Sequence, residues 1–570
     1  MPFLLPPPVW SVPAPRPSNA DSDLQGEILA EWRRQPFVLA PESPAWRKRA
    51  AARIGFPGAP ELLPPELAHP TREAWEALAR KARTPKARFN SLYFLNRFKA
   101  PDALVALAGL GAADAASWPS HLHLEAQIAA ARLNGATPDP GLQAFLDGLA
   151  KAGKVDPVRA QAARLRLVMV GLEKDLLPPV PATPGAVLAL MDSLNRGPAA
   201  VRAELMRKAG DDILTLLPLL GCAPSQDPAL RPLLAQRLTE GPVEGTDEGW
   251  LRIAAQSSIP SIRQSALGYL GKLGAIAADQ VTAPQKGPIF QASVLPSLRL
   301  VAPKQADALR TRLLAGPSAV ARAAAIDDLP APPADLEALS RRCYQDEDLE
   351  SALELFAAFD RWKLPPERQK ALLEPFLNHP DWGWRYQAWL QLRKTEPAAP
   401  WPSAPTERPV DKALLAEAAR LARRGKPVRL RIAFSGRRTV TLRLDPTVAP
   451  MNVANLVLLA RKRFFDHRRV PRIVPDFVVQ MGSPFDTMDG GPGYSVRCED
   501  SLAWYGPGSV GMALAGKDTG GCQFFITTNA TPHLTGKYTR VGEVEDPDHA
   551  LPLLDALELG ARIETVRVVE

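Results

Sequence analysis

The sequence predicts a chain of two unlike parts, a long all-helical region followed by a smaller antiparallel β domain. The chain has 570 residues, more than a single hydrophobic core normally holds. Residues 46–395 are rich in Ala, Leu and Arg at helical spacing, with no convincing pair of strands. From residue 428 onward, apolar residues alternate with polar ones, as in a strand with one buried face.

The composition is that of a globular protein with many prolines. The chain is 46% apolar and 23% charged, and its 60 prolines are scattered between apolar helical segments. They therefore indicate helix starts and loops more than one disordered tail. The net charge of +8 permits weak attraction to nucleic acid without establishing it. Its local basic cluster, at 461–463 and 468–469, is typical of a solvated helix end and loop, so we expect no nucleic-acid partner.

The cysteines and the first residues exclude further classes. Four widely spaced cysteines show no C-x-x-C pair, so we expect no zinc site, no other metal, no cofactor and no disulfide framework. Residues 1–45 predict a Pro-rich lead-in with one short helix around 25–32. They show no signal-peptide pattern, and no stretch long enough to span a membrane follows. A cytoplasmic location is the default expectation.

The helical region contains a weak internal repeat. Arg, Ala and Leu recur at i, i+3 and i+7 within 258–273, 317–329 and 379–393. This spacing places a small residue and a Leu on one helix face, with the Arg at its edge, as stacked helix pairs require. The three stretches resemble second helices of HEAT repeats, so we expect a HEAT-like solenoid that binds client proteins or partners. A less regular helical array is the alternative.

A Pro-rich linker at 396–409 and a helix at 411–424 make up a connecting segment, 396–426, whose helix could belong to either part. The β domain, 427–570, begins with an antiparallel hairpin around a turn at Ser435 and Gly436. A helix at 450–462, several strands, a second helix near 550–557 and a last strand near 564–569 follow.

Three sequence blocks in this domain combine one charged donor with apolar and aromatic residues. They are Arg-Ile-Val-Pro-Asp-Phe-Val-Val-Gln at 472–480, Cys-Gln-Phe-Phe-Ile at 522–526 and Leu-Thr-Gly-Lys-Tyr at 534–538. A single guanidinium facing an apolar pocket, with amides beside it, suits a neutral ring-bearing ligand with one polar atom. Proline within a peptide is such a ligand.

In order and spacing, these blocks resemble those of the cyclophilins, the peptidyl-prolyl cis/trans isomerases. The resemblance covers 427–570 and implies an eight-stranded antiparallel β-barrel capped by two helices. It also implies an enzyme that rotates X-Pro bonds in client proteins and assists their folding. Arg472 would be the catalytic donor, supported by Gln480. The substrate would be held by Phe477, Val478, Ala513, Leu514, Gln523, Phe525, His533, Leu534 and Tyr538.

Several positions depart from the family pattern. Val478 replaces the usual Met, Leu514 the usual Asn, and Tyr538 the usual His. His533 replaces a frequent Trp that helps to bind cyclosporin in the family, so weak cyclosporin sensitivity is expected. Met481 replaces a Gly of a tight turn, which could distort the chain locally. These departures keep a second hypothesis open, in which the domain binds proline segments but turns them over weakly.

Overall fold

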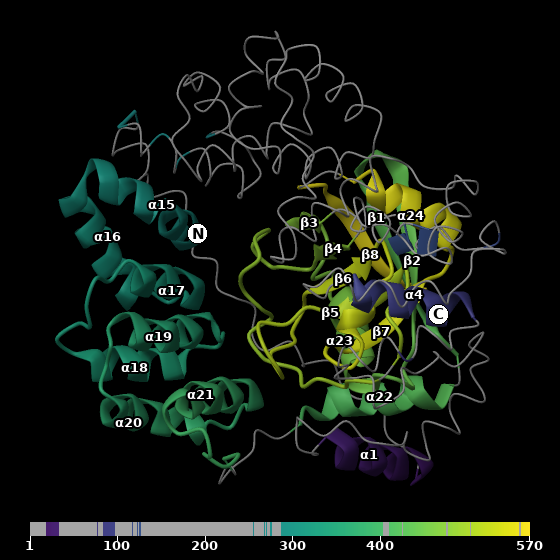
Figure 1. Ribbon diagram of the computed structural model, residues 1–570, viewed down its shortest axis with the longest axis horizontal. Coiled ribbons are helices and arrows are strands. Elements are labelled where there is room, and N and C mark those ends of the chain that lie inside the picture. Colours follow the sequence, from purple (N-terminus) through teal and green to yellow (C-terminus); the bar gives the residue numbers. More distant parts are fainter. Residues whose placement is uncertain are drawn as a thin grey trace.

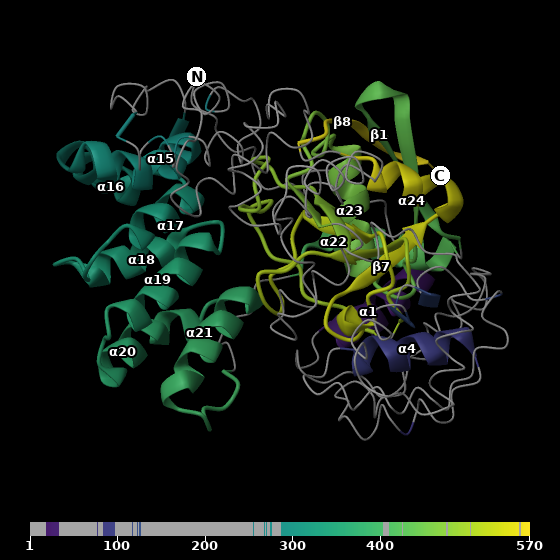
Figure 2. The ribbon, with the colours of Figure 1, turned by 45° about the horizontal axis from the view of Figure 1, so that its top comes forward.

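The structure is a computed structural model of the whole chain. It describes residues 19–32, 84–96, 287–402, 410–424, 426–474, 477–501, 503–557 and 560–569, and a few isolated positions between 77 and 275. Most of the helical stretch predicted at 258–273 therefore lies outside the described residues, as does Cys222. Figure 1 shows a column of helices beside a barrel-like β-sheet, and Figure 2 shows the same two bodies from a second direction.

Seven described helices form the column. They are α15 (Gly287–Val301), α16 (Pro303–Ala315), α17 (Ala319–Asp327), α18 (Leu336–Gln345), α19 (Glu350–Arg361), α20 (Pro366–Leu377) and α21 (Trp382–Thr395). Prolines begin α16 and α20, and the side chains of Ser318, Asp335 and Asp381 cap α17, α18 and α21. From α15 to α21, helices pack mainly on their first or second neighbours along the chain, as in a stack.

The two repeat positions in the described column carry arginines in alike surroundings. Arg322 and Arg385 are both buried. Arg322 donates to the carbonyls of Leu314, in the last turn of α16, and of Gly316, directly after that helix. Arg385 donates to two carbonyls just after α20. The arginines therefore satisfy carbonyl groups left unpaired where the preceding helix ends.

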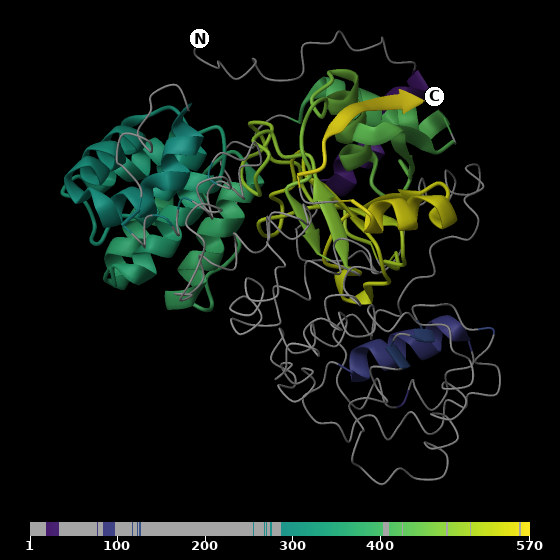
Figure 3. The same ribbon diagram turned by 90° about the horizontal axis from the view of Figure 1, so that it is seen from above.

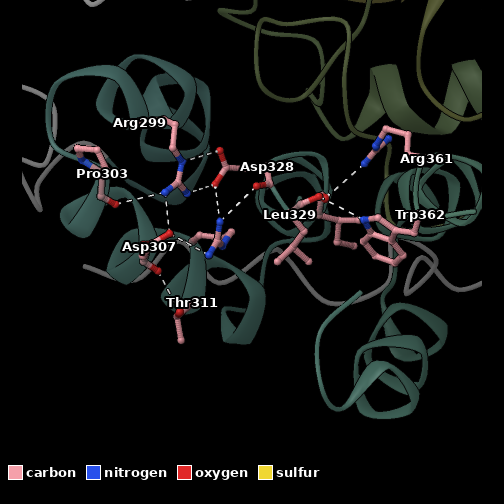
Figure 4. Close-up of polar contacts among 10 residues, drawn as sticks. Arg299, Pro303, Asp307, Thr311, Asp328, Leu329, Arg361 and Trp362 are labelled. Atoms are coloured by element: carbon pink, nitrogen blue, oxygen red, sulfur yellow. Dashed lines mark hydrogen bonds and ion pairs between the residues drawn. The ribbon is translucent and has the colours of Figure 1, made fainter. Parts of the chain in front are cut away.

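Buried and half-buried charges join the ends of neighbouring helices. Arg322 also holds the Asp346 carboxylate at 2.7 and 3.0 Å, which fixes the turn after α18. Higher in the column, Arg299 and Arg310 share Asp328, and Trp362 donates its indole N–H to the Leu329 carbonyl (Figure 4).

The β domain is one antiparallel eight-stranded sheet in the order β3-β4-β6-β5-β7-β2-β1-β8. The strands are β1 (Val428–Phe434), β2 (Arg438–Leu444), β3 (Arg472–Val474), β4 (Val478–Met481), β5 (Ser509–Met512), β6 (Phe524–Thr527), β7 (Arg540–Val544) and β8 (Ile563–Val569). The two ends of this order meet, because Val470 and Ile563 donate to the carbonyls of Ala561 and Arg468. The predicted hairpin is confirmed: β1 buries alternate residues, and Gly436 turns with φ 77°.

Helices cover the sheet and complete its core. The core residues come from the strands and from α23 (Pro450–Arg461) and α24 (Pro547–Asp555), close to the two predicted helices. The connecting helix α22 (Lys412–Arg424) packs in the same core through Leu414, Ala418 and Leu421. It therefore belongs with the barrel. A helix near the start of the chain, α1 (Asn19–Trp32), packs on α22, and its Ile28 joins this core.

Two helical elements contact loops of the barrel. Helix α4 (Pro85–Leu95) lies outside the barrel (Figure 3), where Asn90 accepts a hydrogen bond from the Trp504 indole. On the side of the column, the Arg497 guanidinium lies 3.6 Å from the centroid of the Trp382 ring in α21. Gln387, also in α21, donates to the Ala515 carbonyl. The helical parts thus touch loops of the barrel on two sides.

We expect Arg322→Ala to lower the free energy of unfolding by about 3–5 kcal/mol, because Asp346 and two carbonyls would remain buried without their partner. Urea unfolding followed by circular dichroism measures this change. Arg368→Ala is the control, since Arg368 is 47% exposed and its pair with Glu337 should contribute less than about 1 kcal/mol. Equal, small losses for both variants would contradict this account.

Candidate active site

A half-buried arginine begins the candidate site. β3 and β4 pair antiparallel with Arg472 directly opposite Gln480, so both side chains lie on one face of the sheet. Arg472 Nη1 donates to Gln480 Oε1 at 3.0 Å. Gln480 Nε2 in turn donates to Gln523 Oε1 at 3.0 Å. Two amide side chains therefore fix the direction of the guanidinium.

The chain of amides continues into a loop of the barrel. Gln523 Nε2 donates to the carbonyls of Met488 and Gly490, at 3.0 and 3.1 Å. Because the amide of Gln523 is held at both ends, its oxygen faces Gln480 and its nitrogen faces the loop. The position of the loop at 488–491 thus bears on the position of Arg472.

No described carboxylate neutralises the charge of Arg472. Among the described residues, no carboxylate forms an ion pair with this guanidinium. Burial lowers its pKa, and the nearby Tyr538 phenol opposes this effect. An arginine remains charged at all ordinary pH values even so. The site therefore contains a positively charged donor that is positioned by a neutral amide, that of Gln480.

An apolar cluster contains most of the predicted substrate-binding residues. Val478, Phe525 and Leu534 are buried in it, while Phe477, Ala513 and Tyr538 are partly buried against them. The Phe525 and Tyr538 rings meet edge to face, with centroids 5.8 Å apart. Leu514 lies next to this cluster and lines a cavity together with Gln480 and Gln523. The structure thus brings together the side chains predicted from the sequence.

Two aromatic residues of this region were not predicted from the sequence. Tyr505 is fully buried in the cluster, stacks on Phe525 and donates its hydroxyl to the Tyr538 carbonyl. Tyr93, from α4, stacks on His533 and its hydroxyl bonds His533 Nδ1. His533 also stacks on Phe477. For Tyr505, the only sequence signal is an isolated aromatic residue near the end of a loop. For Tyr93, no sequence pattern indicated a place near the site.

The distortion expected at Met481 does not occur. Met481 ends β4 in regular pairing with Phe524, and its side chain is buried in the barrel core. The positive φ falls on the next residue, Gly482, at 101°, where a Cβ would come within 2.5 Å of the Cys522 carbonyl oxygen. Cys522 is buried, and burial raises the pKa of its thiol.

Acidic residues of the helical column reach the same loop. Glu350 accepts a hydrogen bond from the Gly490 N–H, at 2.5 Å, and Asp348 accepts one from the Gly491 N–H, at 2.6 Å. A cavity of about 270 Å³ lies between these carboxylates and the amides of Gln480 and Gln523. The helical column therefore forms one wall of a cavity that opens beside the candidate site.

These carboxylates repel one another in a poorly solvated place. Burial and the neighbouring Asp348 raise the pKa of Glu350 to about 7, against the bond from Gly490. Burial also raises the pKa of Asp348 and of Asp489, which lies in the loop itself.

In the described part of the chain, no group of acidic, histidine or cysteine side chains is placed to hold a metal ion. No described helix is long and apolar enough to cross a membrane.

Comparison with known proteins identifies the barrel. The family model described as cyclophilin type peptidyl-prolyl cis-trans isomerase/CLD matches residues 429–569. A peptidyl-prolyl cis-trans isomerase of Synechococcus elongatus is 40% identical over 131 residues, which are 23% of this chain and 90% of that protein. Peptidyl-prolyl cis-trans isomerase B of Bacillus subtilis is 44% identical over 107 residues, which are 18% of this chain and 75% of that protein.

The chain therefore belongs to the cyclophilin-type peptidyl-prolyl cis-trans isomerases, through a domain that occupies its last quarter. These matches leave the helical column without a counterpart among the relatives named.

The raised pKa of Glu350 predicts a specific dependence of stability on pH. Between about pH 4.5 and 7, folded Glu350 holds a proton that the unfolded chain releases, so its contribution to stability falls as pH rises through this window. Glu350→Gln removes this contribution. The free energy of unfolding of the wild type minus that of the variant should therefore decrease as the pH rises toward 7. Urea unfolding at several pH values measures the difference, with the exposed Glu374→Gln as control. Parallel pH curves for wild type and Glu350→Gln would contradict the assignment.

Proposed function

We propose that Arg472 catalyses rotation about X-Pro bonds in client polypeptides whose proline ring enters the apolar cluster. The observation that supports this most directly is a charged guanidinium held at 3.0 Å by the Gln480 amide, with no described carboxylate to neutralise it. Phe477, Val478 and Phe525 would grip the ring together with Leu534 and Tyr538. No nucleophile, metal or cofactor is required, since no covalent bond breaks.

The chemistry follows from amide resonance. Rotation about a peptide bond faces a barrier of ~18–20 kcal/mol, and an uncatalysed X-Pro bond takes roughly tens to hundreds of seconds to isomerise. In the half-rotated state the prolyl nitrogen becomes pyramidal and gains a lone pair. A donor aimed at that nitrogen stabilises the twisted state more than either planar state, which is the condition for catalysis. The rigid fork of an arginine suits this role.

The flanking peptide would bind along the backbone at Ala513 and Leu514. The N–H of Ala513 already donates to the Gln523 carbonyl, so its own carbonyl is the group that would accept a bond from the substrate. His533, stacked between Phe477 and Tyr93, would close the far end of the proline pocket.

For the rest of the chain, we propose one helical domain at 46–395 and an isomerase domain at 427–570, joined by 396–426. The shared positions of Arg322 and Arg385 favour a HEAT-like solenoid, because both arginines bind the end of the preceding helix in the same way. The solenoid would act as a scaffold for client proteins or a partner, and so assist folding of the clients.

The alternative is a domain that binds proline segments but isomerises them weakly. Val478 gives a shallower pocket wall than Met, and Leu514 lacks the amide of Asn. The regular strand at Met481 removes one of the reasons for this alternative. Normal peptide affinity without accelerated exchange would favour it.

Arg472→Ala should lower the catalysed exchange of a short Ala-Pro peptide by about 10²–10³-fold, as expected for loss of a preorganised donor. Exchange NMR with wild-type and variant full chains measures this rate, and peptide titration measures affinity. Arg429→Ala is the control, because Arg429 lies exposed on the outer face of β1 and should leave the rate unchanged. A variant at 472 as active as the wild type would overturn the assignment.

Cyclosporin should inhibit the wild type weakly, because His533 offers less apolar surface than Trp and Tyr93 already stacks on it. Replacing both residues, as Tyr93→Ala with His533→Trp, should strengthen inhibition by about tenfold, the size of one good aromatic contact. Inhibition of peptide exchange measures this effect, with Tyr93→Ala alone as control. Wild-type inhibition as tight as that of a cyclophilin with Trp at this position would contradict the expectation.

A further inference from the structure

The cavity between the helical column and the barrel has no explanation in the chemistry of proline. It is lined on one side by Glu347, Asp348 and Glu350, and on the other by Gln480 and Gln523. These two glutamines are the residues that hold Arg472. A peptide whose proline lies against Arg472 would therefore pass this cavity with a neighbouring side chain.

The wall supplied by the column carries acidic side chains that no described cation pairs with. No ion pair joins Asp348, Glu350 or Asp489 to a described cation. Asp346, at the start of the same acidic segment, is different, because it forms an ion pair with Arg322. Asp348 and Glu350 each accept one bond from a loop N–H, so each keeps acceptor capacity for a further donor.

A second observation points to a ligand in this place. Trp384 of α21 also lines the cavity and is 2% exposed. Its indole N–H is buried and has no hydrogen-bond partner among the described residues. A buried donor without a partner is costly, and the ring would have to shift when a peptide binds for one of its carbonyls to satisfy this donor.

We propose that this cavity is a substrate subsite, which takes a lysine or arginine side chain of the same peptide whose proline lies against Arg472. The carboxylates of Asp348 and Glu350 bind the cationic end, with Glu347 adding negative charge at the rim. An organic cation fits better than a metal ion, since the described acidic residues are not grouped as metal ligands. The subsite rests on the proposed function of Arg472, and it makes the helical column part of substrate recognition.

The test compares peptides that differ only in one charge. Six positions are tested, three before the proline and three after it. At each position one peptide of the pair carries lysine and the other carries norleucine, which has a similar aliphatic chain but no charge. Exchange NMR with the full chain should give a catalytic efficiency about fivefold higher for lysine at one position or more, the effect of one partly exposed ion pair. The preference should shrink as sodium chloride rises, because salt screens such pairs.

The matched variant is Asp348→Asn with Glu350→Gln, which removes both charges but keeps the oxygens that accept bonds from Gly490 and Gly491. It should lose the lysine preference, so that the lysine and norleucine peptides of each pair are exchanged with equal efficiency. Glu374→Gln, an exposed change on α20, should keep the preference. Loss of efficiency on both peptides of each pair would show a structural role instead and overturn the proposal.

A binding measurement separates this proposal from the proposed catalytic role. Arg472→Ala, titrated with the same peptides by NMR, should still bind the lysine peptide about fivefold tighter than its norleucine partner. If the wild type accelerates exchange but shows no preference for lysine over norleucine at any of the six positions, the proposed subsite is wrong and the proposed isomerase activity is still supported. If no peptide exchanges faster with the wild type, the proposed function fails, and the binding preference alone then decides on the subsite.

Discussion

The site depends on keeping one guanidinium charged, half-buried and fixed in direction without giving it a counter-ion. A carboxylate would hold Arg472 more firmly, but it would also neutralise the charge on which the proposed catalysis depends. An amide oxygen binds one N–H and leaves the charge intact. Gln480 does this at 3.0 Å, and it must itself be held, or its flexible side chain would turn away. Gln523 and the carbonyls of Met488 and Gly490 supply that support.

This requirement extends the site beyond the barrel. The loop at 488–491 is the last link of the amide chain, and the column binds its backbone through Asp348 and Glu350. On the other side, Asn90 and Tyr93 of α4 bind the Trp504 and His533 side chains, beside the residues that form the proline pocket. The loops of a barrel are its least constrained parts, so elements from outside the barrel that bind them can bear on what the site accepts.

Much of the barrel could be predicted from the sequence, and the reason is local. The alternation of buried and exposed residues from Val428 to Phe434 fixed the hairpin, and three motif blocks placed Arg472 beside Gln480. The contact of Glu350 with Gly490 joins residues 140 positions apart, and no periodic pattern records such a pairing. The burial of Arg322 was missed for a related reason: a charged residue at helical spacing usually faces solvent, and its partner Asp346 lies in another helix turn.

Selectivity in such an enzyme has to come from outside its proline pocket. Every X-Pro bond offers the same ring and the same nitrogen, so the proposed proline pocket, with Val478, Phe525 and Leu534, would treat clients alike. Clients differ in the residues that flank the proline. An enzyme site discriminates among clients when its own polar groups find partners in the flanking side chains of one client and remain without partners in another. In the proposed subsite, the buried carboxylates of Asp348 and Glu350 would make such a distinction by charge. The helical column would then serve catalysis by choosing which proline reaches Arg472, while the barrel alone determines how fast it turns.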